Sequence, residues 1–155
     1  MSKIIIIIGL PGSGKTMYLK DNAEKFRDFF ICDDYHKSGY KKSKCFEDSL
    51  FYDDMQKALK EGKDVALTDI AYCKTERLKN AEEGIKKIAK ELNLEIKTEY
   101  LYFENDPETC KQNILLRNRA NRIFRELKYI DETSKQYAIP KGVKIFPVFR
   151  KEKNI

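Results

Sequence analysis

The residues whose types and spacing best suit chemistry form the run Gly9-Leu10-Pro11-Gly12-Ser13-Gly14-Lys15-Thr16, a match to G-x-x-x-x-G-K-[ST]. Glycines permit positive φ and let backbone N–H groups approach an oxygen-rich ligand without a Cβ in the way. In this pattern the lysine reaches the β- and γ-phosphates, and the hydroxyl after it ligates Mg²⁺. The run therefore predicts a site for ATP and Mg²⁺, with the nucleotide held by Gly9, Pro11, Gly12, Ser13, Gly14, Lys15 and Thr16.

Acidic residues follow two further apolar segments. Asp33 and Asp34 come directly after the segment 29–32, and Asp69 follows the segment 65–68. Transfer of a phosphoryl group to a hydroxyl needs a carboxylate that orients the hydroxyl and takes its proton. We predict this role for Asp33, substrate contact for Asp34 and Asp69, and a share in Mg²⁺ binding for Asp69. The alternative for all three is a polar turn or helix cap, which aspartate also favours.

His36 is the only histidine, so a metal site built on it lacks histidine partners. We predict that it contacts substrate, with a polar loop position as the alternative.

Arginines are concentrated between two helical patterns near residues 115–128, at positions 117, 119, 122 and 125. On a mobile lid they would close over the triphosphate and neutralise charge that develops during transfer. We predict catalytic roles for Arg117 and Arg122 ahead of the other two. A solvated helix face is the alternative.

The elements that must position these residues alternate along the chain. The isoleucines at 4–8 predict a strand buried on both faces, and further strands are predicted at 29–32, 65–68, 95–103 and 143–149. Helical patterns separate them, at 14–26, before Glu61-Gly62, at 78–92, and from Pro107 to about 136. This order predicts an α/β fold: a three-layer αβα P-loop NTPase with a parallel five-stranded sheet and an arginine-bearing helical lid. Ligands of such sheets bind at the carboxyl ends of the strands.

The 155 residues predict a single domain over 1–155. The apolar run 4–8 is too short to cross a membrane and leads into the glycines without a cleavage site, so we expect a cytoplasmic protein. The four cysteines show no C-x-x-C spacing and predict reduced, buried thiols. The net charge of +6, concentrated near the C-terminus, favours a nucleic acid partner, with a solvated basic surface as the alternative. No protein partner is predicted.

Six segments together carry a resemblance to a known family: GLPGSGKT, CDDYH, LTDIAYCKTERL, NDPETC, NILLRNRANR and YAIP. They resemble the kinase domain of bacteriophage polynucleotide kinases and the related small P-loop kinases, including the AAA-type and zeta-toxin-like ones. The resemblance extends to about Pro140, and Asp33-Asp34-Tyr35 is its most discriminating part. It implies that Lys15 and Thr16 bind phosphate and metal, that Asp33 activates the acceptor hydroxyl, that Asp69 helps to build the site, and that Arg117 and Arg122 are lid arginines. His36 stands where the family has an arginine that holds the acceptor's 3′-phosphate.

From the residues and the resemblance we expect an ATP-dependent kinase acting on a hydroxyl of a nucleic acid, either a 5′ end or a hydroxylated base. Three alternatives stay open at this point. One is a small-molecule or nucleoside kinase. Another is an NTP-hydrolysing switch with a protein partner, and the third is a basic nucleic-acid-binding module with a structural nucleotide.

Overall fold

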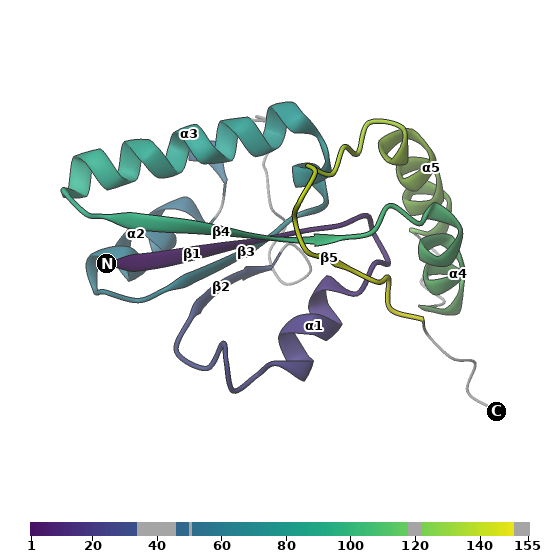
Figure 1. The fold of residues 1–155 in the computed structure, drawn as a ribbon, viewed down its shortest axis with the longest axis horizontal. Helices are drawn as coiled ribbons and strands as arrows, with labels where there is room; N and C mark the ends of the chain where they lie inside the picture. Colours follow the sequence, from purple (N-terminus) through teal and green to yellow (C-terminus); the bar gives the residue numbers. More distant parts are fainter. Residues whose placement is uncertain (34–45, 50, 118–121, 151–155) are drawn as a thin grey trace.

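The computed structural model describes residues 1–33, 46–49, 51–117 and 122–150, with Asp33 described by its backbone alone (Figure 1). Five strands form one sheet in the order β2-β3-β1-β4-β5, and every neighbouring pair is parallel. They are β1 (Ser2–Ile8), β2 (Phe30–Asp33), β3 (Val65–Thr68), β4 (Ile96–Phe103) and β5 (Ile145–Phe146). The predicted α/β fold with a parallel five-stranded sheet is confirmed.

Helices cover both faces of this sheet. They are α1 (Lys15–Asp21), α2 (Tyr52–Lys60), α3 (Thr75–Leu92), α4 (Pro107–Arg117) and α5 (Ile123–Ser134), with short 3₁₀ helices η1 (Phe46–Asp48) and η2 (Ile70–Cys73). Side chains alternate along β1, so Ile4, Ile6 and Ile8 pack with α2 and α3, whereas Ile5 and Ile7 pack with α1. In Figure 1, α3 runs along one side of the sheet, α1 lies on the other, and α4 and α5 stand beyond one end. The arrangement is compatible with three layers.

Two elements are shorter than the sequence pattern predicts. The first helix ends at Asp21 rather than at 26. The next residue, Asn22, caps this end by donating both its backbone N–H and its Nδ2 to the Tyr18 carbonyl. Within the predicted range 14–26, Leu19 and Phe26 are buried, whereas Ala23 is exposed. The last strand covers two residues rather than 143–149.

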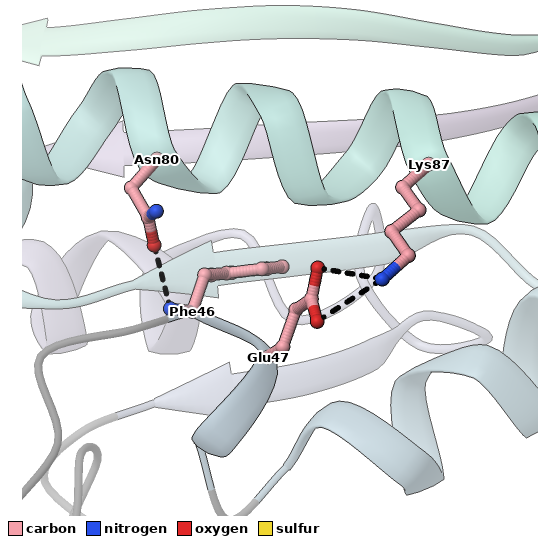
Figure 2. Close-up of polar contacts among 4 residues, drawn as sticks. All are labelled: Phe46, Glu47, Asn80 and Lys87. Carbon is pink, nitrogen blue, oxygen red and sulfur yellow. Dashed lines mark hydrogen bonds and ion pairs between the residues drawn. The ribbon is translucent and has the colours of Figure 1, made fainter.

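The 3₁₀ helix η1 is fixed to α3 by polar and apolar contacts (Figure 2). The Phe46 backbone N–H donates to Asn80 Oδ1 at 2.6 Å, and Lys87 Nζ lies 3.2 Å from both carboxylate oxygens of Glu47. The Phe46 ring is fully buried against Gly84, where an added Cβ would lie 2.5 Å from Phe46 Cδ2. A helix-interior glycine is unfavourable by itself, and this close approach explains its presence.

The described part of the chain contains no helix long and apolar enough to cross a membrane. Cys32, Cys73 and Cys110 are buried thiols, as predicted, and Cys45 lies outside the described residues.

Candidate functional site

Three predicted segments end at the same edge of the sheet. β1 leads into the loop 9–14, β2 ends at Asp33, and β3 ends at Thr68, one residue before Asp69. The register places the Asp33 backbone beside Thr68, and Thr68 beside Ile7 of β1. Because all three strands are parallel, their carboxyl ends meet at one edge, where open α/β sheets bind ligands.

The loop after β1 has the backbone conformation that its glycines make possible. Gly12 has φ 80° and Gly14, the N-cap of α1, has φ 107°, both in the left-handed region that other residues rarely adopt. Lys15 begins α1 and folds back over the loop. Its Nζ donates to the carbonyls of Gly9 at 2.7 Å and Leu10 at 3.0 Å. The loop is thus a compact turn with one cation held within it.

A pocket of about 240 Å³ lies between this loop and the helices α4 and α5. Its lining residues are Pro11, Gly12, Gly14, Lys15, Thr16, Ile70, Arg117, Arg122, Arg125, Glu126 and Tyr129. Four cationic side chains and one carboxylate therefore line a single cavity. Such an excess of positive charge suits a polyphosphate.

Three of the four arginines that the sequence singles out line the pocket. Arg117 at the end of α4 and Arg122, the N-cap of α5, both line it. Arg125, for which the sequence predicts a catalytic role only after Arg117 and Arg122, also lines the pocket. Arg119 lies outside the described residues.

Asp69 combines burial with a local structural role. Its side chain is 5 % exposed, and Oδ1 accepts the Ala71 N–H at 2.8 Å as the N-cap of η2. The cap that the sequence offered as the alternative reading is thus present. The next residue, Ile70, lines the pocket, so Asp69 lies one residue from it along the chain.

Two buried thiols lie near Lys15. Burial raises the pKa of the Cys73 thiol to about 12, and the nearby Lys15 charge offsets this only in part. Burial likewise raises the pKa of the Cys110 thiol to about 12. Both thiols are protonated at neutral pH and are poor nucleophiles.

Asn113 of α4, which the sequence analysis did not single out, holds the loop from the side. Its side chain is 4 % exposed, and Nδ2 donates to the Gly12 carbonyl at 2.8 Å and to the Phe149 carbonyl. The Phe149 N–H donates in turn to the Ser13 carbonyl at 3.0 Å. An asparagine on the inner face of a predicted helix was the one available signal, since a buried amide needs partners.

Several predicted residues have no described side chain. Asp33 is placed by its backbone at the end of β2. Asp34 and His36 lie outside the described residues. Their predicted roles stay predictions.

One similar protein is Uncharacterized protein R277 of Acanthamoeba polyphaga mimivirus, 32 % identical over 141 residues. The alignment covers 88 % of this chain and 87 % of that protein. No protein-family model matches the chain.

Proposed function

We propose that this chain, which belongs to one family with the mimivirus protein R277, is an ATP-dependent P-loop kinase that phosphorylates a hydroxyl of a nucleic acid. The observation that carries the proposal is the pocket, where the loop with its two left-handed glycines and Lys15 faces Arg117, Arg122 and Arg125. A glycine-rich loop alone is a common turn. Arginines from two other helices facing the same loop supply the charge that a triphosphate needs.

In the proposed reaction the acceptor oxygen attacks the γ-phosphorus, the bond between that phosphorus and the β–γ bridging oxygen breaks, and ADP leaves. Lys15 exchanges its loop carbonyls for phosphate oxygens. The pocket arginines stabilise the negative charge on the transferring group. Asp33, at the end of β2, orients the acceptor hydroxyl and takes its proton.

The donor set suits a magnesium ion that arrives with the nucleotide. Thr16 lines the pocket and Asp69 precedes a pocket residue, so a hydroxyl and a carboxylate, both hard oxygen ligands, would hold it. Among the described residues no group of three or more His, Cys, Asp or Glu forms a metal site of its own. Magnesium commonly binds through one or two carboxylates plus substrate phosphates, and when bound it would neutralise phosphate charge.

Two features favour a nucleic acid over a small acceptor. The net charge is +6, and Asp33-Asp34-Tyr35 resembles the acceptor side of polynucleotide kinases. A dependence of the acceptor KM on salt would separate the two classes, because binding a polyanion releases counterions and weakens steeply as salt rises.

The test is transfer of label from [γ-³²P]ATP with Mg²⁺ to 5′-hydroxyl DNA, 5′-hydroxyl RNA, DNA with hydroxymethylated bases, and a nucleoside panel. We expect label on an oligonucleotide, a loss of about a hundredfold or more in Lys15→Ala and Asp33→Ala, and full activity in the exposed control Asp28→Ala. Label on nucleosides alone would leave a nucleoside kinase. Free phosphate produced equally by wild type and Asp33→Ala would refute the kinase and favour the NTP-hydrolysing switch.

A further inference from the structure

One long edge of the sheet is open along β4. β5 pairs only with Tyr102 and Phe103, and no other described strand lies against 96–101 on that side. Figure 1 shows β5 beside one end of β4 alone. An open strand presents unpaired backbone N–H and C=O groups, which is a template for another strand.

The backbone groups that face this edge follow from the neighbouring hydrogen bonds. Ser2 N–H donates to the Glu95 carbonyl at 3.1 Å, so odd-numbered residues point toward β1. Glu104 N–H donates to the Phe146 carbonyl at 2.9 Å, so even-numbered residues point the other way. Alternation along a strand therefore turns the N–H and C=O groups of Ile96, Thr98 and Tyr100 toward the open edge.

The sequence of this edge is complementary to itself. If two copies pair antiparallel about a two-fold axis at Thr98, Lys97 of each copy lies opposite Glu99 of the other, and Ile96 lies opposite Tyr100. Opposite charges, an aliphatic–aromatic pair and a threonine pair all stabilise antiparallel strands. Axes at Lys97 or at Glu99 would instead bring like charges together. The charges therefore exclude those two axes, and the axis at Thr98 centres the pairing on the open residues 96–100 of β4.

The α3 side of the same edge is shaped for this pairing. A groove of about 270 Å³ separates α3 from β4 and is lined by Glu82, Ile85, Lys86, Ala89, Ile96, Thr98 and Tyr100. The Tyr100 hydroxyl donates to Glu82 Oε2 at 2.5 Å, which fixes the ring over the groove. In the paired arrangement Ile96 of the second copy lies beside this ring and covers apolar surface that one copy leaves open.

We propose that the open edge of β4 is a homodimer interface, in which two copies pair β4 antiparallel about Thr98 and form a sheet continuous across both chains. About six backbone hydrogen bonds would join the copies, two at each facing pair of outward residues. The interface is isologous, as in most dimers with two-fold symmetry. It is independent of the proposed kinase activity.

Sedimentation velocity and light scattering across a dilution series test the proposal, and we expect a mass twice the 18.2 kDa of one chain. Lys97→Glu places like charges opposite each other at two symmetric positions and should weaken the dimer about tenfold or more. The exchange Lys97→Glu with Glu99→Lys restores opposite charges and should restore the dimer. The exposed control Lys60→Glu changes net charge equally and should have no effect.

Thr98→Pro removes an N–H that faces the edge rather than β1, so the chain should fold as a monomer, with circular dichroism as the check on folding. If that variant does not fold, the charge exchange decides. A single-chain mass at every concentration overturns the proposal. A dimer unchanged by Lys97→Glu overturns it as well.

Discussion

Gly84 lies in the middle of α3, where alanine would normally stabilise the protein. Replacing glycine by alanine in a helix interior is favourable by about 1 kcal/mol. In this helix, however, the new Cβ would lie 2.5 Å from Phe46 Cδ2, 3.2 Å from Cε2 and 3.4 Å from Cγ. Carbon atoms pack best at roughly 3.5–4.0 Å, so the ring must move by about 1 Å.

The Phe46 ring has little room to move. Its backbone N–H is held by Asn80 at 2.6 Å, and its carbonyl accepts the Ser49 hydroxyl at 2.7 Å. The ring makes edge contacts with the rings of Phe51 and Tyr52, each at a centroid distance of 5.8 Å. Overpacking a close-packed core costs about 1–3 kcal/mol. Added to the helix propensity, this predicts a free energy of unfolding equal to that of the wild type or up to about 2 kcal/mol lower.

Urea unfolding followed by circular dichroism, in two backgrounds, isolates the steric term. Phe46→Leu removes the ring atoms that meet the new Cβ, so Gly84→Ala in that background should stabilise by about 1 kcal/mol. The expected coupling between the two sites is about 1–3 kcal/mol. Glu83→Ala and Glu83→Gly, at the exposed neighbouring position, measure the propensity difference in the same helix. An equal effect of Gly84→Ala in both backgrounds would refute the packing argument.

Three further predictions concern α4 and the carboxyl ends of β1 and β4. Asp106 accepts the hydroxyl and the backbone N–H of Thr109, and these bonds lower the pKa of the Asp106 carboxyl. Asp106 should contribute about 1 kcal/mol to the free energy of unfolding, measured as the difference from Asp106→Ala. Acid unfolding curves should show this difference at neutral pH and its loss as pH falls through the lowered pKa of Asp106. Asn113→Leu should weaken binding of the proposed ATP, because the loop loses the amide that bonds the Gly12 carbonyl. An ATP affinity equal to that of the wild type in calorimetry would contradict this role of Asn113. The Tyr137 hydroxyl donates to the Phe103 carbonyl at 2.5 Å and lies 3.3 Å from the Ile8 carbonyl. Tyr137→Phe should therefore lower the free energy of unfolding in urea by about 1–2 kcal/mol, and an unchanged value would contradict a stabilising role of this hydroxyl.

The fold was predictable wherever local pattern and tertiary structure agree. The isoleucine run 4–8 forms a strand with 0–1 % exposure at each isoleucine, because a central parallel strand is buried on both faces. The strand 65–68 was predicted with the bounds that the structure shows. Asp106-Pro107 does begin a helix, since aspartate caps the first turn and proline suits its first position.

The sequence pattern was misleading where distant groups compete for the backbone. Apolar residues continue to Phe149, which favoured a long last strand. In the structure the Val148 N–H binds Glu104 Oε1, and the Phe149 N–H binds the Ser13 carbonyl. Both partners are remote in sequence, so no local periodicity reveals them. The same holds for Asn113, whose partners lie 101 and 36 residues away.

The position of Asn113 bears on how the pocket arginines would contact the proposed nucleotide. Asn113 and Arg117 lie one turn apart on α4, and Asn113 is bonded to the loop that Arg117 faces across the pocket. Lys111 of the same helix forms an ion pair with Asp131 of α5, which ties the two helices together. These contacts lie on either side of the predicted lid 115–128 and hold α4 and α5 where they flank it. Arg117 is therefore carried by a helix that is already bonded to the loop, which would limit its reorganisation in the proposed phosphoryl transfer. Removing the hydrogen bond from Asn113 to the Gly12 carbonyl should then lower the contribution of Arg117 to turnover by the proposed kinase. The effects of Asn113→Leu and Arg117→Ala on that turnover should therefore be less than additive.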